Sequence, residues 1–342
     1  MKLVALRELA DLLQGRMPRF ITHAHADPNE GGYVPIFTFH SLEPRDFKAK
    51  LEHLRRNHYR TVTLDQVVSH LTGGTPLPER AVALTIDDAR LTTWTVGLPL
   101  LRRYGMTATA FVIPGYTPEG EPRPTLDDVD AGQLQHDEIA DRQSNCNWAE
   151  LAAMQASGHV QIESHTMLHR RVMTSAAATQ RVPSDYDNHR YLVPAPLDAV
   201  TPWDRVPVGA PLGPARPLLA VDTAFDPGGS TPRDTADTQR WELVESRRLI
   251  EARLPGKVVR HFCYPESAGT PRTLAMLHDA GYVSACWGRH DARLANHADT
   301  DPLRLGRLKH DHILALPGDG RTPLLHTLAT KSLRRLTGRT GF

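Results

Sequence analysis

The sequence predicts an α/β fold in which βα units surround a parallel sheet or barrel. Short apolar runs alternate with amphipathic segments of helical spacing along most of the 342 residues, a pattern typical of parallel strands that return through helices. Three helical patterns end on a glycine, at Gly105, Gly158 and Gly281, where helices commonly stop. Two of the strand-like runs end on acidic or histidine residues, and barrels of this class gather their chemistry at such strand ends.

Composition bounds the kind of protein. The mass of 38.0 kDa fits one large α/β domain or two smaller ones. A formal net charge of +1 gives no whole-protein field that favours nucleic acid or another polyanion. The 18 histidines supply candidate metal ligands and proton carriers. The cysteines share no short spacing, so neither a zinc knuckle nor a disulfide framework is predicted.

The first residues predict an amphipathic helix. Arg7, Glu8 and Asp11 interrupt its apolar positions, whereas a secretory signal has an uninterrupted apolar stretch. No segment of the chain approaches the roughly 20 apolar residues that a membrane span needs. We therefore expect a cytoplasmic protein without a transmembrane segment.

The expected elements follow one another in βα order. Strands are expected at 34–40, 81–87, 108–114, 160–165, 258–265 and 283–288, and helices at 47–57, 96–105, 148–158, 241–254 and 274–281. The predicted organisation is a helix and linker at 1–32, a barrel at 33–315 and a basic tail at 316–342. Two polar stretches, about 116–147 and 175–237, follow strand ends and lack a clear period. Because loops of this length are commonly functional, we expect both to cover one mouth of the barrel.

The stretch LTIDDAR ends an apolar run on Asp87 and Asp88. Adjacent carboxylates repel each other and bury poorly, so this placement costs stability unless another group uses it. By itself the pattern also fits an Asx turn or a helix N-cap.

A second motif, VQIESHTMLHR, places His165 and His169 four positions apart. This spacing predicts two imidazoles on one side of a helical turn. Two histidines and one carboxylate form the ligand set of hydrolytic metal sites.

Together the two motifs resemble those of the NodB-homology polysaccharide deacetylases, usually written TFDDG and H[ST]xxH. The resemblance extends over roughly residues 33–313 outside the two insertions; it is also carried by the segments 34–44, 147–169, 241–267, 274–286 and 301–310. The resemblance implies a single distorted (β/α) barrel of NodB-homology type with the two insertions over its active-site mouth.

The resemblance also implies roles for the first two motifs. Asp87 would be the general base, and Asp88, His165 and His169 would hold a divalent metal and its attacking water. Zn²⁺ suits these ligands best, and Co²⁺, Ni²⁺ or Fe²⁺ also fit. Such a cation lowers the pKa of bound water toward ~7 and offsets the repulsion between the aspartates.

The third motif of the family corresponds to HFCYPES, where a backbone N–H near Tyr264 and Pro265 would complete an oxyanion hole. Cys263 stands where many members carry an arginine, and Glu266 stands where an aromatic residue normally lines the sugar site. The family glycine after the aspartate pair is Ala89 here, so the turn must tolerate a Cβ atom.

Four further residues are candidates by resemblance. His310 and His312 lie where the late catalytic histidine falls, and their alternation with Asp311 suggests one face of a strand. His40 ends an early strand and is a candidate for substrate contact. Arg307 resembles the late family arginine and is a candidate partner of Asp87; an ordinary structural ion pair is the alternative.

The predicted activity is metal-dependent removal of an N-acetyl group from an amino-sugar substrate. A cytoplasmic location favours a nucleotide- or lipid-linked glycoside over an exported polymer. The alternatives are a C–N hydrolase of a non-sugar amide, formamide or cyclic ureide, and a non-catalytic glycan-binding domain. Neither nucleic acid nor an oligomeric state is indicated.

Overall fold

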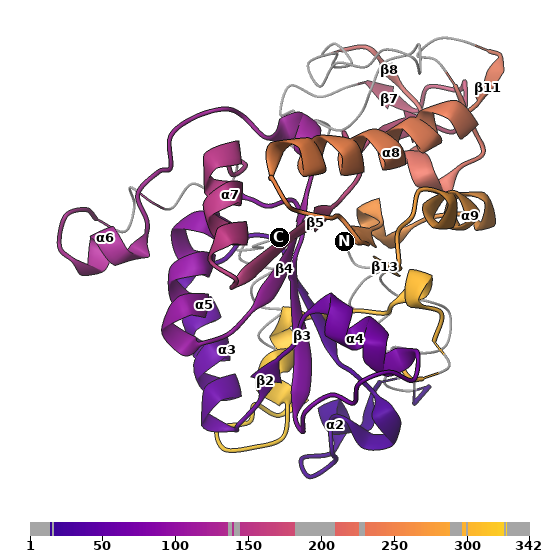
Figure 1. Ribbon diagram of the computed structural model, residues 1–342. Coiled ribbons are helices and arrows are strands. Elements are labelled where there is room, and N and C mark those ends of the chain that lie inside the picture. The colour runs from indigo at the N-terminus through magenta and orange to yellow at the C-terminus, as the bar shows by residue number, and fades with distance from the viewer. Residues whose placement is uncertain are drawn as a thin grey trace. The chain divides into compact units, whose positions relative to one another are not determined.

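The computed structural model describes residues 14–15, 17–135, 139, 144–181, 209–225, 230–287, 296–298, 300–324 and 326 (Figure 1). The chain divides into two compact units. The first unit comprises residues 1–111, 118–162 and 288–342, and the second comprises residues 112–117 and 163–287.

The first unit is built on parallel strands. They are β1 (Ile36–Phe39), β2 (Arg60–Thr61), β3 (Ala81–Ile86), β4 (Ala108–Val112) and β14 (Leu308–Lys309). β3 pairs with β1 and β4, β14 lies beyond β1, and β2 pairs with the start of β3. Ile86 lies in register with Phe39 and Ala110, so these three strands run side by side to the same edge. All residues of β3 are buried, because central parallel strands are covered on both faces.

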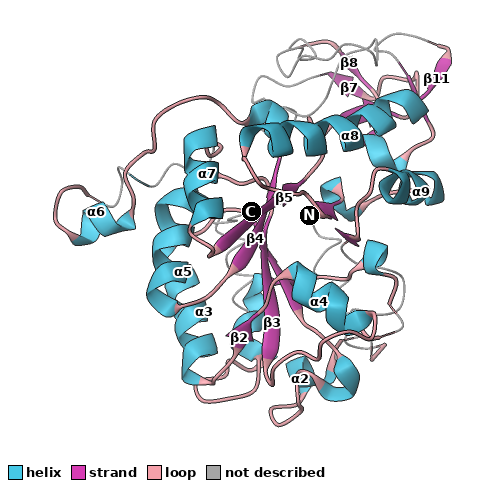
Figure 2. Cartoon of the chain, in the orientation of Figure 1, coloured by secondary structure: helices cyan, strands magenta, loops and turns pink. Residues whose placement is uncertain are grey.

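Helices flank this sheet, as Figure 2 shows in cyan. They are α2 (Arg19–Thr22), α3 (Pro44–Arg56), α4 (Leu64–Leu71), α5 (Leu98–Tyr104), α6 (Leu126–Asp130) and α7 (Trp148–Ala156), with short turns η1 (Glu30–Gly32), η2 (Thr93–Gly97), η8 (Pro302–Arg304) and η9 (His310–Ala315). Their ends have local causes. A capping box of Thr63 and Gln66 begins α4, and another of Asn147 and Glu150 begins α7. Gly105, with φ 63°, ends α5 in the left-handed region.

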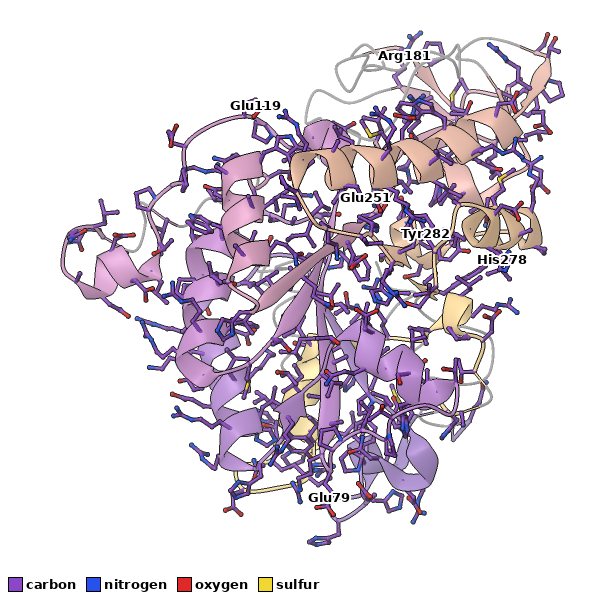
Figure 3. All side chains as sticks on the ribbon, viewed as in Figure 1. Glu79, Glu119, Arg181, Glu251, His278 and Tyr282 are labelled. Atoms are coloured by element: carbon purple, nitrogen blue, oxygen red, sulfur yellow. The ribbon has the colours of Figure 1, made fainter. Side chains whose placement is uncertain are left out.

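The second unit contains the other part of the parallel sheet. β5 (Val160–Ser164) contributes its last residues, β12 (His261–Cys263) pairs with it, and β13 (Ser284–Cys286) pairs with β12. The strand order is β13-β12-β5-β4-β3-β1-β14. The unit's helices are α8 (Ala236–Arg253) and α9 (Pro271–Asp279), with the short turns η3 (Pro114–Tyr116), η6 (Leu218–Ala220) and η7 (Pro265–Ser267). Tyr282, labelled in Figure 3, ties the start of β13 to α8 by donating to Leu243 O at 2.9 Å.

The predicted insertion at 175–237 contains strands that the sequence did not indicate. They are β7 (Gln180–Arg181), β8 (Pro211–Leu212), β9 (Ala215–Pro217), β10 (Thr223–Phe225) and β11 (Pro232–Asp234), joined by β6 (Arg171–Met173) just before it. β11-β10-β6-β9 form an antiparallel sheet, and β7 pairs with β8. The apolar cluster of this antiparallel sheet is buried and consists of Val172, Leu218, Val221 and Ala224. Strands of two or three residues are too short to show an alternating pattern, so the sequence predicted a loop.

The prediction of an α/β fold with parallel strands is confirmed, and α7, α8 and α9 match predicted helices. Residues 1–13 of the expected N-terminal helix, 182–208 and 226–229 of the insertion, and 327–342 of the tail lie outside the described residues. Among the described helices, none combines the length and the hydrophobicity that crossing a bilayer requires.

Acidification below pH about 6.5 should destabilise the first unit through His53. This α3 side chain is buried; its Nε2 lies 3.2 Å from Leu316 O, and its Nδ1 lies 3.4 Å from the Asn57 Nδ2 donor. Both contacts suit neutral imidazole, and burial lowers the pKa of His53. Because the folded pKa lies below the unfolded pKa, stability is present above the unfolded value and is lost as the pH falls toward the folded one.

The measurement compares melting temperatures at pH 7.5 and pH 5.5 in the wild type and in His53→Gln, which keeps a donor for Leu316 O. The melting temperature of the wild type should fall by about 2 °C more than that of the variant, which corresponds to at least a fraction of a kcal/mol in the free energy of unfolding. The other histidines are identical in the two proteins, so equal losses would contradict the role given to His53.

Candidate functional site

Asp87 is buried at the end of β3 and is held by the first unit. Its N–H donates to Phe39 O at 2.8 Å. Arg307 Nη1 and Nη2 donate to its two carboxylate oxygens at 2.6 and 2.8 Å. Thr38 Oγ1 lies 3.4 Å from Asp87 Oδ2. Asp87 and Arg307 are each 4% exposed, so water screens this bidentate contact weakly, and the carboxylate has a single orientation.

The turn after Asp87 is strained. Asp88 has φ 66° and Ala89 has φ 43°, a left-handed conformation that glycine adopts without strain. The Cβ atom of Ala89 therefore makes this backbone conformation less favourable than it would be for glycine. The turn is fixed by two contacts, Cys146 N–H donating to Ala89 O at 2.9 Å and Arg90 Nη2 donating to Asp88 Oδ2 at 2.9 Å. Strain of this kind concentrates at functional sites.

The three candidate histidines of the first unit, His40, His310 and His312, lie in different surroundings. His40 Nε2 lies 3.8 Å from Asp87 Oδ2, and its side chain is 40% exposed. His310 stacks on Phe39 with ring centroids 4.7 Å apart, and its Nδ1 lies 3.9 Å from the carboxylates of Asp46 and Asp311. His312 is buried. The prediction that His310 and His312 share one face of a strand is wrong: β14 ends at Lys309, and His310 begins the 3-10 turn η9, whose period of three turns the two rings apart.

The second unit brings His165 and His169 together. His165 follows β5, and its Nδ1 lies 2.7 Å from Cys263 O. Because a carbonyl only accepts, Nδ1 carries the proton and Nε2 carries the lone pair that a metal ion needs. The two rings are 4.8 Å apart and nearly perpendicular, and both residues are buried.

The histidine segment is not helical, contrary to the prediction. Thr166 and His169 have φ values of 67° and 49°, and no helix is assigned between β5 and β6. Thr166 Oγ1 instead accepts from His169 N–H at 2.8 Å. A short side chain that bonds to a backbone N–H three residues on competes with helix formation, which explains the tight turn.

Two residues that the sequence analysis did not single out, Arg170 and Glu242, hold the histidine turn. Glu242 on α8 lies 2.7 Å from Arg170 Nε, accepts from Leu168 N–H at 2.8 Å, and accepts through its backbone O from Met167 N–H. Both side chains are at most 1% exposed. Burial raises the pKa of Glu242, and the Arg170 charge opposes this rise. The sequence did place the acidic Glu242 on the expected helix 241–254, but its partner Arg170 lies 72 positions earlier, so the contact could not be predicted.

The Tyr264–Pro265 turn limits which backbone N–H groups are available as donors. Tyr264 N–H donates to Cys286 O at 3.0 Å within the sheet, and proline has no N–H. Neither residue therefore offers a backbone donor for an oxyanion hole. The next amide in this turn belongs to Glu266, whose φ of 51° turns the chain sharply. The Glu266 side chain pairs with Arg171, at the start of β6.

The fold is shared with solved deacetylase structures. It matches the BpsB deacetylase domain from Bordetella bronchiseptica with a TM-score of 0.60 at 19% identity, over 83% of this chain and 98% of that chain. It matches the de-N-acetylase from Aggregatibacter actinomycetemcomitans with a TM-score of 0.55 at 18% identity, over 81% and 94%. It also matches IcaB from Ammonifex degensii with a TM-score of 0.53 at 19% identity, over 90% and 98%. The fold class is thus the α/β barrel type of the NodB-homology proteins, as expected.

The sequence comparison matches part of the chain to a family model. Residues 74–218, which include both aspartates and both histidines, match the polysaccharide deacetylase family. The chain is also 30% identical over 130 residues to the poly-β-1,6-N-acetyl-D-glucosamine N-deacetylase of Escherichia coli K12. That alignment covers 37% of this chain and 18% of the relative, so the chain spans only a small part of the relative's length.

Breaking the Arg170–Glu242 contact should destabilise the protein. Glu242→Leu leaves the Arg170 guanidinium buried without its counter-charge, which costs about 3–5 kcal/mol. Urea unfolding followed by circular dichroism measures this loss. The double variant Arg170→Met/Glu242→Leu should be the more stable of the two, because it buries no unpaired charge. A double variant no more stable than Glu242→Leu would contradict this account.

Proposed function

We propose that this chain is a metal-dependent N-deacetylase that removes an acetyl group from an amino-sugar residue of a glycan. The observation that carries the proposal is the buried Asp87 carboxylate, which accepts two hydrogen bonds from Arg307. Asp87 is adjacent to Asp88, and both lie in the segment that matches the polysaccharide deacetylase family. A buried, oriented carboxylate at a strand end is suited to take a proton from an attacking water.

Asp88, His165 and His169 are the proposed metal ligands. Their donor chemistry fits a divalent ion, because a carboxylate and two imidazoles are borderline ligands that suit Zn²⁺ and its neighbours in the series. All three are buried, and the Cys263 carbonyl sets the tautomer of His165. A bound cation of this kind lowers the pKa of water and polarises an amide carbonyl.

The other residues move protons and stabilise charge. Asp87 is the proposed base, and Arg307 holds its carboxylate in one orientation. His310 or His312 would protonate the leaving amine; His310 Nδ1 lies 3.9 Å from the carboxylates of Asp46 and Asp311. The Glu266 N–H is the proposed oxyanion donor, since the Tyr264 N–H is used in the sheet.

The substrate is proposed to be an N-acetylated glucosamine chain, as the name of the E. coli relative indicates for that protein. The cytoplasmic location predicted from the sequence would instead favour a nucleotide- or lipid-linked glycoside. The substrate panel below includes both classes, so the experiment decides between them.

Acetate release tests the reaction. The protein is stripped of metal, reloaded with Zn²⁺, and assayed on β-1,6- and β-1,4-linked N-acetylglucosamine oligomers and on nucleotide- and lipid-linked acetamido sugars. Asp87→Asn should lower kcat by about 10²–10⁴-fold, because it removes the base. Asp127→Asn on α6 is the matched control, since that aspartate is half exposed and forms an ion pair with Arg103, and it should keep full activity.

Two outcomes would overturn the proposal. Release from a formamide or cyclic ureide, with no acetate from any sugar, would assign a non-sugar C–N hydrolase. Equal activity of Asp87→Asn and the wild type would remove Asp87 from the reaction.

Metal binding tests the ligand set independently of turnover. The wild type should retain about one Zn²⁺ per chain after dialysis, and Zn²⁺ should raise its melting temperature, because a ligand that binds only the folded state stabilises it. His165→Ala and His169→Ala should lose both effects. His278→Ala, a change at an exposed α9 side chain (Figure 3), should keep them. Full Zn²⁺ retention by His165→Ala would exclude this ligand set.

A further inference from the structure

A salt bridge between Arg171 and Glu266 lies beside the histidine segment of the second unit. Arg171 begins β6 two residues after His169, and Glu266 lies in η7, two residues after Tyr264. The backbone just before this turn, at Cys263 O, is the hydrogen-bond acceptor of His165. Both partners of the salt bridge are thus close in the chain to segments that place the two proposed histidine ligands.

The salt bridge is held in place but only partly buried. Arg171 Nη1 donates to Glu266 Oε1, and Arg171 Nη2 donates to Ala215 O on β9 at 2.8 Å. The side chains remain 29% and 39% exposed. Glu266 and Ser267 have φ values of 51° and 59°, so non-glycine residues hold a left-handed turn at this point. Such strain persists where the surrounding structure maintains it and is common at ligand sites.

Stability alone explains this arrangement poorly. Exposed ion pairs contribute about 0–1 kcal/mol, less than the roughly 1–3 kcal/mol that each strained residue costs. Within the described part of the chain, Glu266 Oε2 accepts no hydrogen bond. The remaining Arg171 N–H groups and Glu266 Oε2 therefore present donors and an acceptor next to one another on an exposed edge.

We propose that the Arg171–Glu266 salt bridge is a specificity element that binds adjacent hydroxyl groups of the sugar chain. Each sugar hydroxyl both donates and accepts, so neighbouring hydroxyls match an arginine and a carboxylate fixed side by side. Hydrogen bonds to charged groups are stronger than those between neutral groups. An aromatic side chain at position 266, by contrast, would recognise the apolar face of a sugar ring. This inference rests on the proposed function for the class of ligand.

Binding to a catalytically silenced protein tests the proposal. The parent is Asp87→Asn loaded with Zn²⁺, the ligand is a pentamer of N-acetylglucosamine, and calorimetry gives Kd. Adding Arg171→Ala or Glu266→Ala should raise Kd at least tenfold, through the loss of hydrogen bonds to charged groups.

A charge swap separates recognition from folding. Arg171→Glu/Glu266→Arg should restore the ion pair and the melting temperature lost in either single variant, while Kd stays raised because donors and acceptor have exchanged places. The matched control is Arg272→Ala, which removes another partly exposed ion pair of this unit, with Asp234, and should leave Kd unchanged.

Three results would overturn the inference: Kd within twofold of the parent in both single variants, full recovery of Kd in the swap, or no binding of the pentamer by the parent. The experiments can contradict this inference and the proposed function independently of each other. Acetate release with unchanged Kd in the variants would remove only the specificity element. Weakened binding in the variants of a protein that releases no acetate would retain that element and remove the deacetylase.

Discussion

The site of the first unit depends on the contact between Arg307 and Asp87. Two neighbouring carboxylates at the end of a buried strand repel each other and lose hydration, a combination that is unfavourable without a counter-charge. Arg307 supplies that charge to Asp87 through two hydrogen bonds, and Arg90 supplies one to Asp88 by donating from Nη2 to Oδ2. Since Arg307 immediately precedes β14, which joins β3 through β1, the native sheet brings the arginine to the aspartate. The Asp87–Arg307 contact therefore depends on the paired sheet.

In the second unit, a buried contact between α8 and the histidine turn stabilises the segment that carries His165 and His169. His165 and His169 lie in a turn with two left-handed residues, which has little stability of its own. Glu242 provides what the turn lacks, since its carboxylate contacts Arg170 and its two acceptors satisfy the N–H groups of Met167 and Leu168. The buried helix side chain thus orders the segment that carries the histidines. Rigid support of this kind is what positions a reactive group accurately.

The motif residues and the Arg171–Glu266 salt bridge differ in burial. The aspartates and histidines that match the motifs are buried and braced by charged partners. The Arg171–Glu266 salt bridge stands at a position where the resembling family normally has an aromatic residue, and it is partly exposed. The hydrogen bonds of this pair join β6, β9 and η7 and involve neither the aspartates nor the histidines.

The sequence by itself determined the α/β class, the strand that ends on Asp87 and the spacing of His165 and His169, because apolar periodicity and short motifs are local properties of the chain. It did not determine the 3-10 turn at His310, the non-helical histidine turn or the use of the Tyr264 N–H in the sheet. It also did not single out Arg170 and Glu242. Only the tertiary structure decided these features. Each depends on which distant group meets a hydrogen-bond donor or a charge, and such pairings follow from packing between segments that lie far apart in the chain.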